Sequence, residues 1–342
     1  MSKTVFLGMS GGVDSSVSAI LLKNQGYKVV GVYMRNWSKD LPGMKCPWAE
    51  DLADAKRVAV KLDLDFLVFD FEKEYKEKVV DYMLDEFKAG RTPNPDVMCN
   101  EEIKFKLFFE KAMEHGADYI ATGHYAKSEN GQLKLAKDEN KDQTYFLYRI
   151  SKEAVEKTLF PLADLRKPEV KKLAAEAGLA NAYKKESMGV CFVGEVGMKD
   201  FLSEYIDLRP GEIREIETEK VLGYHDGAVF YTVGQRHGLY VGGGLPYYVV
   251  KKDLPKNIVY VSKNLNADDL WIKELLLTNL FFREKLPDDG EVLVRLRHRA
   301  PLIPAQFDGE KLLFTEEIKR VASGQSVVFY KDDVCLGGGI IQ

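Results

Sequence analysis

Residues 4–26 restrict the fold more than any other stretch, because an apolar run, a pair of glycines and a helical pattern follow one another directly. The run "TVFLGM" is almost continuously apolar, as expected for a strand that is covered on both faces. After "SGGVDSS", residues 15–25 have the pattern of a helix that closes at Gly26. A strand that turns directly into a helix is typical of α/β proteins, whose ligands bind where the strands end.

The same alternation continues through the first two hundred residues. Strands are predicted at 27–34, 65–71 and 117–124, a small hairpin around 130–132, and helices at 49–62, 72–88, about 101–114, about 152–158 and about 168–177. Strands that alternate with helices of this length imply parallel pairing. The fold class predicted for this part is α/β, with a doubly wound parallel sheet.

The pattern changes after about residue 205. Short alternating runs, separated by Gly, Asp, Asn and Pro, occur at 211–216, 228–235, 245–253, 257–262, 291–299, 311–316 and 326–341. Such runs indicate small antiparallel sheets or barrels. We therefore expect three domains: a nucleotide-binding α/β domain over 1–205, a small β-rich connector over 206–268, and a C-terminal β-barrel over 269–342.

Composition narrows the cellular setting. The 342 residues contain no apolar run near the roughly 18 residues of a membrane span, and the first apolar run begins too early for a leader peptide. The four cysteines lie far apart without a Cys-x-x-Cys pair, which argues against a disulfide scaffold and a four-thiolate metal site. A cytoplasmic location is expected. The net charge of −4 disfavours indiscriminate nucleic-acid binding but allows a local basic surface.

The glycine loop has the features of a phosphate site but contains no lysine. Gly11 and Gly12 let successive backbone N–H groups turn toward an anion, and Ser15 or Asp14 could cap the following helix. Without a point charge for a transferring γ-phosphate, the loop suits a pyrophosphate held as one unit, with Asp14 available to Mg²⁺. The alternative is a plain strand-to-helix turn, which the full "SGGVDSS" disfavours.

Two cysteines lie in segments rich in Gly, Pro or Asn. "GRTPNPDVMCN" (90–100) presents Asp96 and Cys99 just before a helix predicted to begin near Glu101, where the helix dipole would favour a thiolate. "ESMGVCFVG" (186–194) contains Cys191. Of the other two, Cys335 lies on an alternating run and fits a buried apolar role, whereas Cys46 lies in a predicted loop, where it could be exposed.

The opening motif resembles the PP-loop ATP pyrophosphatases, and the whole chain resembles the tRNA-specific 2-thiouridylases. The resemblance runs through "GMSGGVDSS", "GRTPNPDVMCN", "TGHY", "NKDQTYFLY", "GVCF", "TVGQRHGL" and "CLGGGII". It implies ATP-dependent replacement of oxygen by sulfur at C2 of the wobble uridine of tRNA, with release of AMP and pyrophosphate. ATP and Mg²⁺ would be required, and a partner protein carrying a persulfide would supply the sulfur.

The resemblance also implies roles for individual residues. Cys191 would carry the persulfide, Cys99 would be the nucleophile, Asp96 the acid/base, and Asn94, Pro95 and Asp96 would flank the target base. ATP would contact Gly8, Met9, Ser10, Gly11, Gly12, Val13, Asp14, Ser15, Met34 and Gly123. The tRNA would contact His124, Lys141, Asp142, Gln143, Arg297, His298 and Gln325. Taken alone, Met34 is more simply a core residue, His124 could be a structural histidine, and 141–143 is by default a solvated turn.

A local basic stripe is predicted within "EVLVRLRHR" (291–299). Strand alternation sends Val292, Val294 and Leu296 to one face, and Arg295, Arg297 and Arg299 to the other. Three arginines on one strand face could bind phosphates despite the negative total charge. A solvated barrel face is the alternative.

The chemistry implied by the resemblance agrees with the residues. A uridine C2 carbonyl becomes reactive when adenylylation turns its oxygen into a leaving group, and two thiols suffice to deliver sulfur and resolve the resulting linkage. Two other functions remain open at this stage. One is another adenylating PP-loop enzyme, which would need no cysteine pair, and the other is a non-catalytic RNA-binding or sulfur-relay protein.

Overall fold

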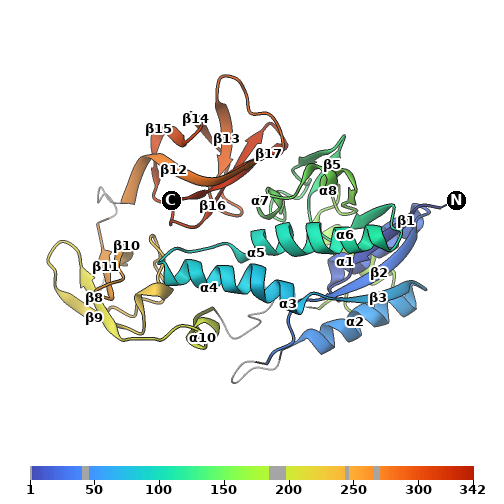
Figure 1. Cartoon of the computed structure of the whole chain (residues 1–342), viewed down its shortest axis with the longest axis horizontal. Coiled ribbons are helices and arrows are strands. Elements are labelled where there is room, and N and C mark those ends of the chain that lie inside the picture. The colour runs from blue at the N-terminus through green and yellow to red at the C-terminus, as the bar shows by residue number, and fades with distance from the viewer. Residues whose placement is uncertain (1, 41–45, 185–197, 243–245, 265–269) are drawn as a thin grey trace.

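The computed structural model describes residues 2–40, 46–184, 198–242, 246–264 and 270–342, which form three sheets. Figure 1 shows the first sheet with its helices on the right, a small sheet at the lower left, and a barrel above them. We call these parts the α/β unit, the central sheet and the barrel. The predicted fold class is confirmed.

The α/β unit contains a five-stranded sheet in the order β3-β2-β1-β4-β7. Its strands are β1 (Thr4–Gly8), β2 (Lys28–Arg35), β3 (Asp65–Asp70), β4 (Tyr119–Ala121) and β7 (Thr158–Leu159). Every neighbouring pair is parallel. Because the strands run the same way, the loops that follow β1, β2 and β4 emerge at one edge of the sheet.

Helices cover both faces of this sheet. On one face, Val5 and Leu7 of β1 pack with α1 (Val13–Asn24), α2 (Trp48–Lys61) and α9 (Lys167–Glu176). On the other face, Phe6 packs with the helices between 72 and 114. Alternate residues of β1 therefore serve two separate cores, as expected for a doubly wound sheet.

The second helical layer consists of two long helices, each with a π-helical segment. The first comprises α3 (Glu72–Tyr75), η1 (Lys76–Val80) and α4 (Asp81–Lys88). The second comprises α5 (Pro95–Met98), η2 (Cys99–Leu107) and α6 (Phe108–Glu114). The shorter helices are α7 (Thr144–Leu147), α8 (Lys152–Glu156) and α10 (Met198–Ser203). π-Helical segments are rare, and the single-turn ones inside α-helices are frequent at functional sites.

The central sheet has the order β10-β11-β8-β9. Its strands are β8 (Gly211–Glu215), β9 (Val221–His225), β10 (Tyr248–Asp253) and β11 (Ile258–Ser262). The expectation of a purely antiparallel sheet is wrong here, because β11 pairs with β8 in parallel. The strand predicted at 228–235 is also wrong. That segment forms the 3₁₀ turn η3 (Ala228–Phe230) and a further turn in which the Gln235 side chain accepts a hydrogen bond from the Thr232 N–H.

The barrel contains β12 (Trp271–Phe282), β13 (Glu291–Arg295), β14 (Ile303–Phe307), β15 (Lys311–Lys319), β16 (Ser326–Lys331) and β17 (Val334–Ile341). The pairing of β12 with β17 closes the ring. A hairpin of the α/β unit, β5 (Lys127–Glu129) and β6 (Gln132–Lys134), extends the barrel sheet beside β17. The α/β unit and the barrel therefore share backbone pairing.

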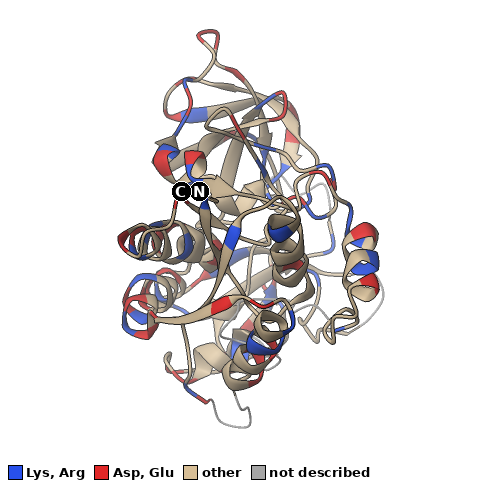
Figure 2. Ribbon diagram, turned by 90° about the vertical axis from the view of Figure 1, so that its right-hand side faces the viewer, with Lys and Arg blue, Asp and Glu red and all other residues tan. Residues whose placement is uncertain are grey.

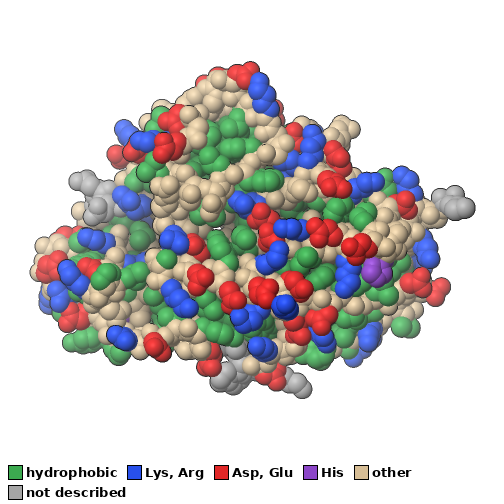
Figure 3. Space-filling model, viewed as in Figure 1, with side chains coloured by type: hydrophobic (Ala, Val, Ile, Leu, Met, Phe, Trp, Pro, Cys, Tyr) green, Lys and Arg blue, Asp and Glu red, His purple; other side chains and the backbone are tan. Residues whose placement is uncertain are grey.

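Charged side chains of both signs are mixed over the surface. Lys and Arg alternate with Asp and Glu along the helices in Figure 2, and the face in Figure 3 shows no broad basic area. Because the charges on the face in Figure 3 are mixed, any recognition of a polyanion there would depend on small groups of residues.

Within the described ranges, no helix is long and apolar enough to cross a membrane.

Candidate functional site

A cavity of about 290 Å³ lies at the edge of the sheet where β1, β2 and β4 end. Seven of the residues predicted to bind ATP line it: Gly8, Met9, Ser10, Asp14, Ser15, Met34 and Gly123. The cavity is also lined by His124 and Gln143, which were predicted to contact tRNA. Its volume is at the lower end of the range for small-molecule sites, about 300–1,000 Å³.

The glycine loop leaves the start of α1 open toward this cavity. The N-cap of α1 is Gly12, so the prediction that Asp14 or Ser15 caps the helix is wrong. Both residues instead lie in the first helical turn, where the Ser15 hydroxyl donates to the Gly12 carbonyl at 3.1 Å. A glycine N-cap has no side chain to cover the first N–H groups of the helix, and these groups remain the natural partners of an anion.

Two glycines allow the loop to pack closely against its surroundings. Gly11 has a φ of +77°, and a Cβ on it would lie 2.5 Å from the Asp51 carbonyl oxygen. A Cβ on Gly123, which follows β4, would lie 2.8 Å from the backbone nitrogen of Ser15. Gly123 therefore supports the loop backbone as well as lining the cavity, and any larger residue would displace the start of α1.

The positive charge that the loop lacks is supplied by a distant residue. Lys167, at the start of α9, donates through Nζ to both carboxylate oxygens of Asp14 at 2.7 and 2.8 Å, and is almost fully buried. The Tyr125 hydroxyl donates to the same carboxylate at 3.0 Å. Lys167 was not predicted from the sequence, because its segment has no motif and only the fold brings it to the loop.

Asp96 and Cys99 lie on the second long helix. The expectation that this helix begins near Glu101 is wrong: α5 begins at Pro95, with Asn94 as its N-cap. Proline is favoured at the first helical position because it has no N–H to leave unpaired. Cys99 is therefore inside the helix and opens the π segment, so the argument from a helix N-terminus does not apply to its thiol.

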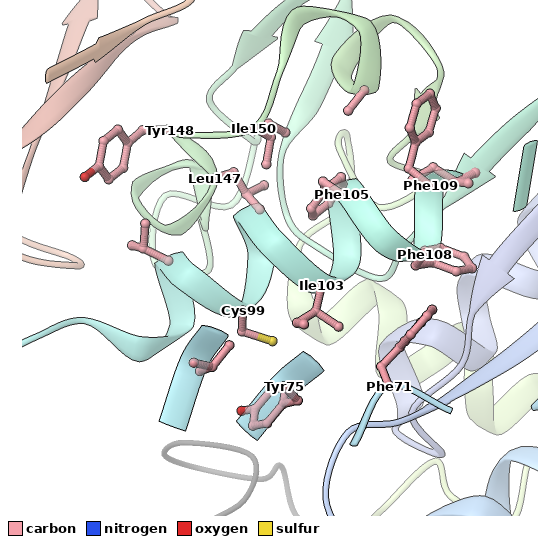
Figure 4. Packing of buried hydrophobic residues seen from close by; sticks show 14 of the residues in the cluster. Phe71, Tyr75, Cys99, Ile103, Phe105, Phe108, Phe109, Leu147, Tyr148 and Ile150 are labelled. Carbon is pink, nitrogen blue, oxygen red and sulfur yellow. The ribbon is translucent and has the colours of Figure 1, made fainter. Parts of the chain in front are cut away.

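The Cys99 side chain is buried with an exposed fraction of 2%. Figure 4 shows it beside Tyr75 and Ile103, in the core between the two long helices. A thiol in this position cannot reach a tRNA base at the surface unless the helix or the residues packed over the thiol move. Cys191, the other predicted catalytic cysteine, lies outside the described residues.

The surroundings of Asp96 shift its pKa. Burial raises the pKa of Asp96 above its ordinary value, and the positive charge of Lys104 acts in the opposite direction. Lys104 also lies 3.5 Å from Nε2 of His124, at the cavity wall. Burial, followed by the charge of Lys104, lowers the pKa of His124 well below its ordinary value, so this imidazole is neutral near pH 7.

The segment 141–143 is only partly at the surface. Asp142 is buried, and its carboxylate accepts from Arg295 Nη1 at 2.9 Å, the Thr144 hydroxyl at 2.6 Å and the Ala136 N–H at 2.9 Å. The solvated-turn interpretation is therefore wrong for Asp142. Its carboxylate is fully used inside the protein, and direct tRNA contact stays a prediction only for its neighbours Lys141 and Gln143.

The arginine stripe predicted over 291–299 is also wrong. The strand β13 ends at Arg295, and Arg299 adopts a φ of +63°, so strand alternation does not continue through this segment. Arg295 is buried in its ion pair with Asp142, whereas Arg297 and Arg299 are exposed. The chain turns after β13, and of the three arginines only the first meets a buried carboxylate.

His298 lies within this turn and packs on an aromatic residue of α7. Its ring centroid is 4.6 Å from that of Phe146. Burial lowers the pKa of His298 to about 4, and the charges of Arg299, Arg295 and Lys141 act in the same direction. The predicted tRNA residues Lys141 and His298 are therefore close together, at the junction of the α/β unit and the barrel.

Gln325 lies at a second junction. Its side-chain Nε2 donates to the Thr92 carbonyl at 2.7 Å, in the loop that precedes Asn94, Pro95 and Asp96.

Over the described residues, no cluster of three His, Cys, Asp or Glu side chains could hold a metal ion. Asp14 and Asp51 lie at the cavity wall, and each is already ion-paired, Asp14 with Lys167 and Asp51 with Lys184. A Mg²⁺ ion that arrives on phosphates needs only one or two carboxylates.

Comparison with known families matches three successive parts of the chain. Residues 3–195 match a family model described as the tRNA methyl transferase HUP domain, and residues 199–263 match the tRNA methyl transferase PRC-barrel domain. Residues 272–341 match the aminomethyltransferase beta-barrel domain. These three matches cover nearly the whole chain.

Two curated relatives are similar over their full length. The tRNA-specific 2-thiouridylase MnmA of Bacillus licheniformis is 48% identical over 351 residues, which cover 98% of this chain and 94% of the relative. The protein of the same name from Listeria monocytogenes serovar 1/2a is 47% identical over 349 residues, with 98% and 94% covered. Similarity at this level extends through the α/β unit, the central sheet and the barrel.

Proposed function

Because the chain belongs to the family of tRNA-specific 2-thiouridylases, we propose that it replaces oxygen by sulfur at C2 of the wobble uridine of tRNA, at the expense of ATP. The observation that best supports this function is the cavity beside the glycine loop, with an uncovered helix start on one side and Lys104 and His124 on the other. A nucleotide in this cavity would have its phosphates at α1 and would lie close to the helix that carries Asp96 and Cys99.

The first proposed step is adenylylation of the uridine. The C2 oxygen attacks the α-phosphorus of ATP, the bond to the bridging oxygen breaks, and pyrophosphate leaves. The N–H groups of Gly11, Gly12 and Val13 would receive the pyrophosphate, as expected for a glycine turn at a helix start. Mg²⁺, when bound to the phosphates, would neutralise part of their charge and contact Asp14.

Lys167 supports the choice of pyrophosphate as the leaving group. Its ammonium group already neutralises Asp14, so this carboxylate does not repel an approaching polyphosphate. As negative charge develops on the leaving pyrophosphate, Lys167 can divide its hydrogen bonds between Asp14 and the anion. The loop would therefore function without a lysine of its own because the fold provides one from α9.

Asp96 is proposed as the group that exchanges a proton with the base. Oxygen O2 of uridine becomes a better nucleophile when the neighbouring N3–H is lost, and a carboxylate is a suitable acceptor. Burial raises the pKa of Asp96 and so brings it closer to the operating pH, as general acid–base catalysis requires. Asn94 and Pro95, directly before it, are proposed to flank the target base.

The second proposed step delivers sulfur. The terminal sulfur of a Cys191 persulfide attacks C2, and AMP departs with the former C2 oxygen. The Cys99 thiolate then attacks the Cys191 sulfur of the remaining S–S bond, which frees the thiolated uridine and leaves a disulfide between the two cysteines. The two electrons needed for this release come from the two thiols, so a reductant is required once per turnover.

The tRNA is proposed to contact both the α/β unit and the barrel. Lys141, Arg297 and His298 lie at their junction, and His124 and Gln143 lie at the wall of the nucleotide cavity. Gln325 would join this surface from the barrel. Because few basic residues are involved, recognition would depend mainly on the shape of the anticodon arm and on an unstacked base.

The remaining assignments are also proposals. We propose domain boundaries of 1–205, 206–268 and 269–342, which are supported by the separate central sheet and by the limits of the three family matches. A persulfide-carrying protein is proposed as the sulfur donor. We propose that the enzyme acts in the cytoplasm, where unmodified tRNA, ATP and reduced thiols are present.

The direct test is nucleoside analysis of tRNA. The purified protein is incubated with unmodified tRNA, ATP, Mg²⁺ and a sulfide or persulfide source, and the digested nucleosides are measured by mass spectrometry. We expect 2-thiouridine that depends on ATP, accompanied by pyrophosphate. Sulfur at another position, or ATP consumption without any thiolated nucleoside, would show that the function is different.

A further inference from the structure

The loop that leads to Asp96 is in contact with all three parts of the molecule. It follows α4, and Arg91 forms two hydrogen bonds with Glu86 of that helix at 2.5 and 2.6 Å. From the central sheet, Lys252 Nζ donates to the Gly90 carbonyl at 2.9 Å, and Thr232 shares a hydrogen bond of 3.2 Å with Thr92. The loop is therefore fixed on the side of the central sheet.

The barrel fixes the opposite side of the same loop. The Thr92 N–H donates to the Ser323 carbonyl at 2.8 Å, and the Gln325 side chain donates to the Thr92 carbonyl at 2.7 Å. Both backbone groups of Thr92 are thus paired with residues 323–325, a turn of the barrel more than two hundred residues away. Between them lies Gly324, with a φ of +89°.

Gly324 leaves no space between the turn and the loop. A Cβ at this position would lie 2.9 Å from the Thr92 nitrogen, 3.0 Å from the Thr92 oxygen and 3.0 Å from the Arg91 Cβ. These neighbours are backbone or Cβ atoms, which cannot rotate away as the end of a long side chain could. A methyl group on Gly324 must therefore push the loop away from the barrel.

The barrel turn itself is firmly held. The Gly324 N–H donates to the Ile341 carbonyl at 2.9 Å, and the Ile341 N–H donates to the Gln325 carbonyl at 2.9 Å. Since Ile341 belongs to β17, which closes the barrel with β12, the turn moves only with the barrel as a whole. A methyl group on Gly324 would therefore displace the loop more than the turn.

A displacement at Thr92 would be passed to Asp96. Only three residues separate them, and two of these, Pro93 and Pro95, have φ fixed by their rings. The third, Asn94, is the N-cap of α5, and Asp96 is the second residue of that helix. The segment has little freedom to absorb a shift before it reaches the carboxylate.

We propose that Gly324 and Gln325 are positioning residues, through which the barrel sets the position of the loop that presents Asn94 and Asp96 to the target base. This proposal rests on the proposed function, because it assigns a purpose to the loop in that reaction. It also gives Gln325 a role other than tRNA contact, since its amide nitrogen is paired with Thr92. Misplacement of a reacting group by about 1 Å can slow a reaction by roughly 100-fold.

The test compares Gly324→Ala with Gly309→Ala. Both glycines belong to the barrel and have positive φ, +89° and +106°, but a Cβ on Gly309 would meet no atom within 4 Å. Both variants therefore strain the barrel backbone, while only Gly324→Ala pushes on the loop. The measurements are kcat for 2-thiouridine formation, the Kd for tRNA and the melting temperature.

We expect Gly324→Ala to have a kcat roughly 10- to 100-fold below that of Gly309→Ala, with a tRNA Kd that matches the control and a melting temperature that shows the variant to be folded at the assay temperature. Equal kcat values in the two variants would overturn the proposal. If Gly324→Ala does not fold, Gln325→Met carries the test, because it removes the hydrogen bond to Thr92 without adding bulk to the turn.

For Gln325→Met, a lowered kcat with unchanged tRNA Kd supports positioning. A raised Kd with unchanged kcat would return Gln325 to a tRNA contact and overturn the proposal. The wild-type protein distinguishes failure of the proposed function from failure of the positioning role. If it forms no 2-thiouridine, the proposed function fails; if it does and the variants match their control, only the positioning role fails.

Discussion

Replacing Arg295 by leucine should destabilise the protein without a specific effect on tRNA binding. The Arg295–Asp142 pair is almost completely buried, with side-chain exposures of 10% and 1%. Removal of the arginine leaves the carboxylate with the Thr144 hydroxyl and the Ala136 N–H as partners, but without a counter-charge. Breaking a buried ion pair in this way costs about 3–5 kcal/mol, a large share of the roughly 5–15 kcal/mol that stabilises a typical protein.

The assay is urea denaturation followed by circular dichroism, with Arg299→Leu as the exposed control. The Asp142→Asn variant and the double variant complete a double-mutant cycle. Because the amide introduced by Asp142→Asn keeps an oxygen for the Ala136 N–H and carries no charge, loss of Arg295 should cost less in that background. The coupling between the two sites should therefore be favourable and should exceed about 1 kcal/mol.

The same variants decide between the buried pair and the arginine stripe. If Arg295 contacted phosphates, Arg295→Leu would lower the salt dependence of tRNA binding by roughly one unit of slope. We expect that change for Arg297→Ala, which is exposed, and not for Arg295→Leu. A loss of stability below about 1 kcal/mol together with a reduced slope would refute the assignment of Arg295 to the interior.

Variants of the site itself test the proposed steps. Lys167→Met should fold, bind tRNA normally and release pyrophosphate far more slowly than wild type; normal tRNA-dependent release would remove Lys167 from the first step. Cys191→Ser and Cys99→Ser should both still adenylylate tRNA. Only Cys99→Ser should take up labelled sulfane sulfur from a persulfide donor, because it keeps Cys191. Multiple turnover by either variant would contradict the two-cysteine mechanism. Lys104→Met removes the positive charge that holds down the pKa of Asp96, so the acid limb of kcat should move to higher pH, and an unmoved limb would show that Asp96 does not titrate in the reaction.

The parallel sheet was predictable because its signals are local. Each of the strands β1 to β4 is a short apolar run, and the helices between them have their own periodicity, so the order of elements implies the pairing. The hairpin at 130–132 was predictable for the same reason, since Asn130 and Gly131 adopt the positive φ values that a tight turn requires. The predicted ATP residues came from the family resemblance, and seven of them line the cavity at the strand ends.

The errors arose where distant residues decide the structure. Alternation in 291–299 sent Arg295 to the solvent face, but the sequence does not show that Asp142 lies opposite it in the interior. Lys167 was missed because its partner Asp14 is 153 residues away. The start of the helix at Pro95 was a local signal that was overlooked, since proline at a first helical position is common.

The strands β7, β9, β12 and β14 were not predicted, and β7 begins where a helix was expected to end. Residues 271–282 form one strand, β12, but its sequence "WIKELLLTNLFF" does not alternate, because the register shifts between Ile272 and Glu274 and again between Thr278 and Phe281. The strand pairs first with β15 and then with β17. Its two partners cover different parts of its length. Closure of a barrel thus depends on pairings that no short window of sequence contains.

The central claim is that the C2 oxygen of uridine attacks ATP and leaves with AMP, and an isotope experiment tests it directly. A tRNA carrying ¹⁸O at C2 of the wobble uridine is incubated with the enzyme, ATP, Mg²⁺ and a persulfide donor, and the AMP produced is analysed by mass spectrometry. Each 2-thiouridine formed should be matched by one AMP that contains ¹⁸O and by one unlabelled pyrophosphate. Unlabelled AMP, or ¹⁸O found in inorganic phosphate, would contradict adenylylation at this oxygen.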